Sequence, residues 1–424
     1  MKSKVSLKGI SYSVMVLAIL MIVTMHPVYA QEKGKPIRIG FVTSLTGPYT
    51  GWGVPASIVY QWVVDQVNKE GGIKSLGGAK VELYISDCES DPKKVATEVE
   101  KMITLRNPQV MLNVIGSPLT KVALPVCQRH KIAMVGMDYS DELFKLNNPF
   151  WFGVFPKVSK MATEMADFFV RTGNATGRAV KKAAVLCQDG SFGETASDTY
   201  RQYLPKLGVE VVANEIYPTG KVADFSDTFA KFKALKADVL FSSAMPYDSV
   251  LITRGMKGAD FNPLGFAFVC TCIDTPDYLK LDKDADFAFG SPILPRDEVV
   301  PKIPGAEATL NKFYSDVGEK GKLCSPMWTL QLMLTIGPVI HAFGKAATYD
   351  PVALRDTIAK LELKTGDRFI YWPGGVKFDN TGWNSGAQMI GGQYQNLKLK
   401  VMYPDSLVVA GNKPVWPIPK WNER

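Results

Sequence analysis

The sequence predicts an α/β protein with two lobes, each a parallel β-sheet flanked by helices. Three observations support this prediction. Residues 37–73 read as a strand, a loop and an amphipathic helix, strand-like runs then alternate with helical patterns, and two extended segments interrupt the alternation. The chain of 424 residues is long enough for two lobes with ample cores.

The opening unit combines a buried strand with a helix. Residues 37–42 form a short apolar, β-branched run. A Gly/Pro/Thr loop follows it, at the carboxyl end of the strand, where open α/β sheets bind their ligands. Beyond the loop, apolar residues recur at helical spacing: Ile58, Val59, Trp62, Val63 and Val67.

Alternation continues along the chain. Strands are expected at 81–87, 110–115, 132–136, 183–187, 209–216, 239–243 and 266–270. Helices are expected near 92–106, 119–130, 158–172, 193–206, 225–236 and 248–257. Strands separated by helices require parallel crossover connections, which define an α/β architecture.

Two extended segments marked by Gly and Pro, Trp151–Pro156 and Phe287–Pro292, fall where one set of βα units gives way to another. We interpret them as hinge crossings between the lobes. Chain order then assigns residues 36–153 plus 292–374 to lobe I, and residues 154–291 plus 375–424 to lobe II.

Residues 1–30 have the pattern of a cleavable signal peptide. Three lysines precede the apolar run Val14–Met25, and Val28–Ala30 forms a small-x-small cleavage pattern. The mature chain is therefore expected to begin at Gln31, and the protein to be exported to the periplasm. An uncleaved anchor is the alternative, although the apolar run is short for a membrane span.

Composition excludes several classes of function. Cleavage would leave 394 residues with a net charge of about +5, since three lysines leave with the signal peptide. No Lys/Arg run is longer than a pair, so nucleic acid is not an expected partner. The mature chain holds six cysteines whose pairing the sequence does not decide, namely Cys88, Cys127, Cys187, Cys270, Cys272 and Cys324.

Catalytic and metal-binding motifs are not recognisable. The pair Cys270 and Cys272 has no second ligand cluster in sequence, so no metal or other cofactor is predicted. His130 and His341 are read as a helix end and a core position. Because there is also no G-x-S-x-G elbow, no catalytic residue is predicted, and an enzyme such as a secreted hydrolase is disfavoured.

Several motifs resemble the leucine/isoleucine/valine-binding proteins, which are periplasmic receptors of branched-chain amino-acid ABC transporters. The opening unit has the S-x-T/S-G-P, W-G and N-x-x-G-G-I pattern, and residues 86–92 resemble the D-x-x-x-D-P segment. Residues 116–120 resemble the first ligand loop, residues 188–194 the D-x-x-Y-G-x-G loop, and the carboxyl tail is also similar. The resemblance covers most of the mature chain.

The resemblance implies a type I periplasmic-binding-protein fold, with two lobes that close on a small solute. It further implies delivery of the solute to the transmembrane subunits of an ABC permease by a monomeric receptor. The solute class stays open between a hydrophobic amino acid and an organic or aromatic acid. An exported sensory module that docks on a membrane receptor would share these sequence features.

Two loops of the first lobe are candidate contacts for a carboxylate. Ser117 and Leu119 of the first loop are both candidate ligand contacts. Ser117 precedes a helix that begins near Leu119, so its hydroxyl and the helix-start amides could bind an anion. The alternative is that Ser117 caps its own helix. Asp138, Tyr139 and Ser140 match the second ligand loop of the family, and a helix cap is again the alternative.

The remaining candidates surround the body of the solute. Trp52 corresponds to an aromatic residue over the ligand, and Phe192 would cover it from the other lobe or pack beneath its own loop. The family glutamate that pairs the ligand ammonium is replaced near Thr271, which suggests an uncharged contact. Either Asp138, Asp248 or Asp274 substitutes for it, or the ligand has no amino group. Two further candidates follow the strand at 239–243, namely Met245 and Tyr247.

Overall fold

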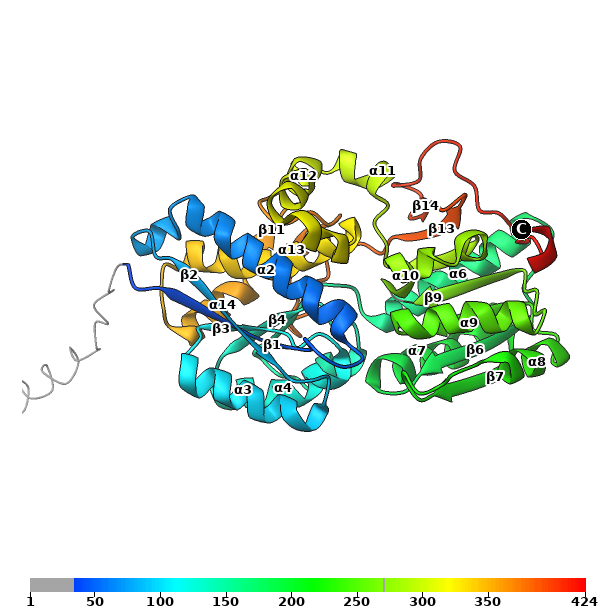
Figure 1. Ribbon diagram of the computed structural model, residues 1–424, viewed down its shortest axis with the longest axis horizontal. Helices are drawn as coiled ribbons and strands as arrows, with labels where there is room; N and C mark the ends of the chain where they lie inside the picture. The colour runs from blue at the N-terminus through cyan, green and yellow to red at the C-terminus, as the bar shows by residue number, and fades with distance from the viewer. Residues whose placement is uncertain (1–33, 270) are drawn as a thin grey trace, which may run out of the picture.

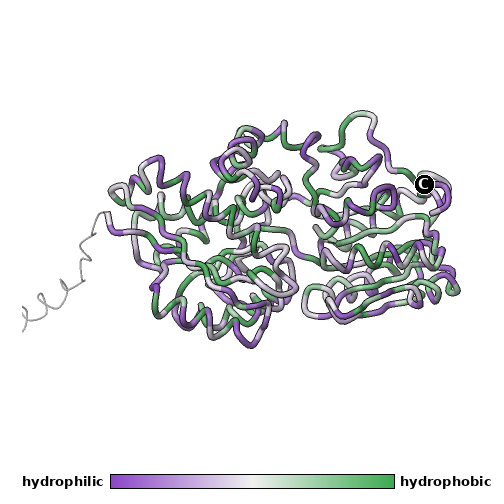
Figure 2. Tube along the Cα trace, in the orientation of Figure 1, coloured by the Kyte–Doolittle hydropathy of each residue, from purple (hydrophilic) through white to green (hydrophobic). Residues whose placement is uncertain are grey.

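The computed structural model describes residues 34–269 and 271–424, and these residues form two α/β lobes side by side (Figure 1). The predicted signal peptide, residues 1–30, and Cys270 lie outside the described residues. Figure 2 shows hydrophobic colour along the central strands of both lobes. The predicted fold class is therefore confirmed.

The first lobe is built on a parallel sheet with the strand order β2-β1-β3-β4-β5. Ile39 of the central strand lies opposite Leu83 on one side and Val110 on the other. The strands are β1 (Ile37–Thr43), β2 (Val81–Asp87), β3 (Val110–Leu112), β4 (Ala133–Gly136) and β5 (Trp151–Gly153). The helices packed with them are α2 (Thr50–Lys69), α3 (Pro92–Arg106), α4 (Ser117–Arg129), α5 (Asp141–Lys145), α12 (Ala306–Val317), α13 (Pro326–Ala346) and α14 (Pro351–Ala359).

The second lobe is built on a mixed sheet with the strand order β14-β13-β10-β9-β8-β6-β7. Its strands are β6 (Lys182–Gln188), β7 (Glu210–Tyr217), β8 (Val239–Ser243), β9 (Gly265–Val269), β10 (Ala288–Ser291), β13 (Gly391–Gln395) and β14 (Lys398–Tyr403). Its helices are α6 (Val158–Ala175), α7 (Ser191–Tyr203), α8 (Ser226–Ala234), α9 (Pro246–Gly258) and α10 (Pro276–Leu279).

Smaller elements complete the chain. A short helix, α11 (Arg296–Val299), follows β10, and β11 (Glu362–Leu363) pairs antiparallel with β12 (Val376–Lys377). The 3₁₀ turns are η1 (Lys74–Leu76), η2 (Leu204–Leu207), η3 (Thr271–Ile273), η4 (Asp282–Ala285), η5 (Val300–Lys302), η6 (Gly318–Leu323) and η7 (Trp421–Glu423).

Local sequence explains the element boundaries. Asp91 accepts a hydrogen bond from Lys93 N at 2.9 Å and so caps α3, while Pro92 occupies the first helical position, where no donor is lost. Helix α13 is apolar and long enough to suggest a membrane span, but most of it is buried in the core of the first lobe. It is the buried core helix that its sequence predicts.

All the expected strands and helices between residues 81 and 270 are present, most with ends within three residues of the prediction. The expectation did not include the antiparallel strands β13 and β14, which continue the second sheet beyond β10. Their polar, Gly-rich sequence, GGQYQ followed by KLKVMY, lacks the apolar run of the parallel strands.

The crossings between the lobes are hydrogen-bonded to one another. Asn384, fully buried, donates its backbone N–H to Gly153 O at 2.9 Å and its side-chain amide to Val154 O at 2.9 Å. Next to them, Ile293 N donates to Ile390 O at 2.9 Å. The crossings near residues 153 and 292 are therefore each bonded to residues 384–390, a third segment that passes between the lobes, where a rotation of one lobe against the other would be taken up.

The carboxyl-terminal third serves both lobes. Val376 and Phe378 pack in the hydrophobic core of the first sheet, whereas Tyr394 and Met402 pack in that of the second. The chain thus returns to the second core closer to residue 390 than to residue 375, where the sequence prediction begins that segment of lobe II. The limits of the lobes as rigid bodies stay a prediction.

Candidate functional site

A narrow cavity lies between the lobes, at the carboxyl ends of the parallel strands of both sheets. Residues from loops and helix starts line it. Five of the lining residues are aromatic, namely Tyr49, Trp52, Tyr139, Phe192 and Trp328. The other lining residues are Ile115, Gly116, Ser117, Pro118, Met137, Asp138 and Gln188.

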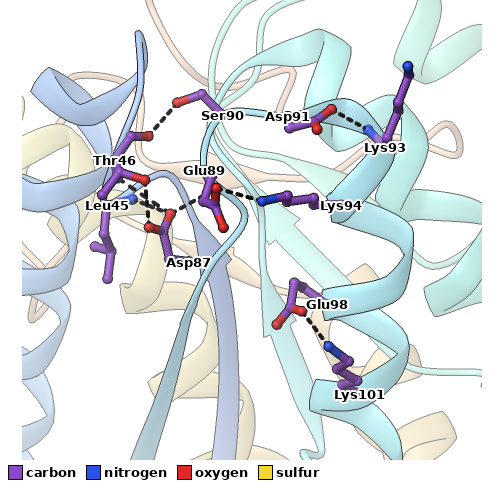
Figure 3. Close-up of polar contacts among 10 residues, drawn as sticks. All are labelled: Leu45, Thr46, Asp87, Glu89, Ser90, Asp91, Lys93, Lys94, Glu98 and Lys101. Atoms are coloured by element: carbon purple, nitrogen blue, oxygen red, sulfur yellow. Dashed lines mark hydrogen bonds and ion pairs between the residues drawn. The ribbon is translucent and has the colours of Figure 1, made fainter.

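The loop between β1 and α2 is held in place by Asp87, at the end of β2 (Figure 3). Its carboxylate accepts hydrogen bonds from Leu45 N at 2.9 Å and from Thr46 Oγ1 at 2.8 Å. Ser90 adds a hydrogen bond to Thr46 O at 2.7 Å and accepts one from Tyr49 N at 3.1 Å. Asp87 and Ser90 therefore fix the loop that brings Tyr49 to the cavity.

Tyr49 packs directly on the backbone of Gly116. A Cβ at position 116 would lie 2.6 Å from Tyr49 Cε1, and the φ of Gly116 is +114°, so only glycine fits. Burial raises the pKa of Tyr49 to about 12, and the negative charge of Asp138 acts in the same direction. The phenol is therefore a neutral wall of the cavity at physiological pH.

Two tryptophans separate this cavity from a larger outer one. Trp52 in α2 and Trp328 in the first turn of α13 have ring centroids 6.1 Å apart. Both rings also line an outer cavity, whose other lining residues include Asp274 and Ser325. The two rings therefore lie between the inner and the outer cavity.

Asp138 has an internal role in the first lobe. Its carboxylate accepts hydrogen bonds from Asn113 Nδ2 at 2.6 Å, from Gly116 N at 2.8 Å and from the hydroxyl of Thr120. Burial raises the pKa of Asp138, although these three hydrogen bonds oppose the rise. Asp138 therefore ties the loop after β4 to the start of α4, and its acceptor capacity is largely used.

Ser117 does not cap its helix, which corrects one of the two alternatives that the sequence left open. Gly116 is the N-cap residue of α4, and no side chain caps it. Ser117 Oγ instead accepts a hydrogen bond from Ser140 N at 3.3 Å, and the residue lines the cavity. Leu119 is buried among apolar residues of α4 and β3 and does not line the cavity.

The second loop joins the two lobes. Ser140 is the N-cap of α5, accepting a weak hydrogen bond from Glu142 N at 3.4 Å, as the alternative interpretation expected. The same hydroxyl donates to Ser191 O of the second lobe at 3.1 Å. Beside it, the rings of Tyr139 and Phe192 have centroids 6.0 Å apart, so the lobes are in contact over the cavity.

Of the ten residues predicted to contact ligand, the structure brings five to the cavity: Trp52, Ser117, Asp138, Tyr139 and Phe192. Ser140 lies just behind Tyr139, at the contact between the lobes. Met245 is buried at the N-cap of α9 and Tyr247 is 63% exposed, and neither lines the inner cavity. The side chain of Thr271 lies outside the described structure.

Seven lining residues were not predicted from the sequence, and three of them bring a ring or an amide to the cavity, namely Tyr49, Gln188 and Trp328. Tyr49 and Gln188 stand within motifs that were recognised, so their position at a strand's carboxyl end was an available signal. Trp328 stands in an apolar helix far along the chain, and its sequence gave no sign of a cavity position.

Two further carboxyl groups of the second lobe lie near the cleft. Burial raises the pKa of Asp248 to about 6, with Asp189 adding to the rise and Gly220 N–H opposing it. Asp274 lines the outer cavity and accepts a hydrogen bond from Ser325 Oγ of the first lobe at 2.7 Å. Among the described residues no group of three His, Cys, Asp or Glu side chains could hold a metal ion.

This architecture, two α/β lobes with a closed cavity at their carboxyl edges, is that of a binding protein. The chain belongs to the periplasmic binding protein family, whose sequence model matches residues 36–384. It is 23% identical over 402 residues to Leu/Ile/Val-binding protein homolog 7 of Brucella abortus, covering 90% of this chain and 94% of that protein.

Solved structures with the same fold include a leucine-binding protein LivK of Thermotoga maritima, with a TM-score of 0.74 and 15% identity over 88% of this chain and 100% of that one. Another is a fatty acid ABC transporter substrate-binding protein of Thermomonospora curvata, with a TM-score of 0.71 and 17% identity over 87% and 93% of the two chains. The resemblance to leucine/isoleucine/valine-binding proteins is confirmed. The protein is a solute-binding protein and not an enzyme, and its family implies an extracytoplasmic location.

Proposed function

We propose that this protein is the receptor of an ABC importer and that it delivers a small carboxylate with a hydrophobic body to the permease. The observation that carries the proposal is the cavity itself, which is lined by five aromatic residues and by the first residues of α4. Family membership supports the transport role. Ligand sites of this kind are concave and mostly apolar, with a few polar groups that orient the solute.

Ser117 is the proposed contact for the carboxylate. Its hydroxyl belongs to the first turn of a helix of 13 residues, where the dipole favours a negative charge. Its backbone N–H is also one of the donors that a helix leaves without an intrahelical partner. Asp138 shares this region, but its raised pKa and its three donors reduce the repulsion of an anion.

The cavity favours an acid without an α-amino group. Within the described part of the chain, Asp138 is the one carboxylate in the lining, and three donors of the protein already bind it. An ammonium in this cavity would lack a free charge partner, and a buried unpaired charge is costly. Asp274 and Asp248 lie outside the lining, which leaves leucine-type ligands less favoured than their deaminated counterparts.

A thermal-shift screen of amino acids and organic acids tests the proposal, followed by calorimetry on the positive compounds. A true ligand at about 100 times its Kd should add about 2.7 kcal/mol to the free energy of unfolding. We expect a larger shift with 4-methyl-2-oxopentanoate or an aromatic acid than with leucine. Submicromolar leucine binding with no response to any acid would contradict the preference for a solute without an amino group.

A further inference from the structure

Gln188 places an unsatisfied amide in the wall of the cavity. It is the last residue of β6, it is 3% exposed, and it lines the cavity from the second lobe. Its Oε1 is buried and has no hydrogen-bond donor among the residues that the structure describes. A buried amide without a partner costs free energy of folding, so its presence here requires an explanation.

The fold does not need an amide at this position. Gln188 pairs with Tyr217 of β7 through the backbone, and this pairing does not use the Gln188 side chain. Beside it the cavity is formed by the rings of Phe192 and Tyr49, against which an aliphatic side chain would pack without desolvating a polar group. The cost of the amide would be recovered if the solute supplied the missing hydrogen bond.

A second unpartnered group lines the same cavity from the first lobe. Trp328 is 7% exposed, and its Nε1–H has no acceptor among the described residues. Trp328 and Gln188 come from different lobes, so a solute held between the lobes could supply a partner to each of them. If Ser117 binds the carboxylate of the solute, the Gln188 amide and the Trp328 Nε1–H remain available for another group of the solute.

The charge of the cavity restricts what that group can be. Among the residues that the structure describes, the lining contains no Lys, Arg or His that could pair a second anion. A cationic group on the solute is disfavoured as well, because the carboxylate of Asp138 already accepts hydrogen bonds from three donors of the protein. The amide of Gln188 both donates and accepts, and a hydroxyl or carboxamide complements it in either orientation of the amide.

We propose that the solute carries, besides its carboxylate, an uncharged hydroxyl or carboxamide that binds the side chain of Gln188, and that Gln188 selects such solutes over their purely hydrophobic parents. This inference rests on the proposed function, because it assumes that the inner cavity holds a hydrophobic acid. The solute class is a hydroxylated or amidated hydrophobic acid. Its body lies among the rings, and its two polar ends face Ser117 and Gln188.

Calorimetry with matched pairs of acids tests the inference. The pairs are benzoate and 4-hydroxybenzoate, 3-phenylpropanoate and 3-(4-hydroxyphenyl)propanoate, and hexanoate and 6-hydroxyhexanoate. In the unmodified protein at least one hydroxylated acid should bind about tenfold or more tightly than its parent, since a site built for a hydroxyl discriminates against its loss. In Gln188→Leu the ratio of affinities within that pair should fall to about twofold or less.

The matched control is Gln202→Leu, an exposed glutamine on α7 of the same lobe, which should keep the full preference. Equal affinities within every pair in the unmodified protein would overturn the inference, because Gln188 would then be satisfied by water, while the proposed function would stand. The comparison of paired acids in the unmodified protein tests the inference even if the Gln188 variant fails to fold. Failure of all six acids to bind would overturn the proposed function and the inference with it.

Discussion

Ser325 of the first lobe donates a hydrogen bond of 2.7 Å from its Oγ to Oδ2 of Asp274 in the second lobe. The same hydroxyl accepts a hydrogen bond from Trp328 N at 3.2 Å and so caps α13. The residue that fixes the tryptophan wall of the cavity is thus also a contact between the lobes. This arrangement couples the position of Trp328 to closure.

Removing the carboxylate of Asp274 should favour the open form. In Asp274→Ala the contact to Ser325 is lost, and a hydrogen bond to a charged group contributes about 1.5 to 3 kcal/mol. Affinity for the solute should fall by about ten- to a hundredfold, because less of the protein is in the closed form. The radius of gyration without ligand, measured by small-angle scattering, should increase.

The control for this variant is Asp277→Ala. Asp277 lies in the same outer cavity, but it pairs with Lys280 of its own lobe and is largely exposed. It should leave affinity and radius of gyration unchanged. Equal behaviour of the two variants would show that the contact between Ser325 and Asp274 has no part in closure.

Ser117→Ala should weaken binding of a carboxylate by about 1.5 to 3 kcal/mol, since a hydrogen bond to a charged group is lost. Stability should change by only about 1 kcal/mol, because Ser117 has no capping bond and loses only the contact with Ser140 N. Calorimetry and urea unfolding measure the two effects separately. Ser57→Ala, which removes a hydroxyl bonded within α2, serves as the control. Undiminished affinity in a folded Ser117 variant would place the carboxylate elsewhere.

Asp138→Asn should destabilise the ligand-free protein by about 1 to 3 kcal/mol, because one of the three buried donors would face an NH₂ group. Urea unfolding without ligand measures this loss. Asp91→Asn is the matched control, since Asn caps a helix about as well as Asp does. A stable Asp138 variant that has lost only its affinity would mean that this carboxylate contacts the solute.

Asp248 should make stability depend on pH. Burial raises its pKa to about 6, above the ordinary 3.8, so the folded state holds the proton more tightly than the unfolded state. The stability that the folded state gains by holding this proton is fully present below about pH 4 and is lost as pH rises through about 6. Its facing groups are Asp189, Tyr217 and Gly220 N–H.

Asp248→Asn should therefore remove this slope and be stabilised relative to the parent above pH 6. The gain should be about 1 to 2 kcal/mol once solvent screening in the cleft is counted. Urea unfolding at pH 4.5 and pH 7.5 measures it, with the exposed Asp198→Asn as the control. A difference between variant and parent that is the same at both pH values would contradict the raised pKa.

The fold was predictable because its strands are apolar runs separated by helical periods, and β2, β8 and α3 have the predicted ends. The role of Asp138 was not predictable. Its partners Asn113 and Thr120 lie 25 and 18 residues away, and only the pairing of β3 with β4 brings the loops together. Trp328 likewise reaches the cavity because α13 packs against α2, a contact between distant parts of the chain.

Helix α13 has a consequence for biosynthesis. All five strands of the first sheet are complete by residue 153, yet the helix that fills its core begins at Pro326, after the parallel part of the second sheet. A nascent chain cannot bury that sheet until most of the protein has been made. The second sheet in turn waits for β13 and β14. Neither lobe is an autonomous folding unit, and a chain truncated near residue 291 should aggregate rather than leave one working lobe.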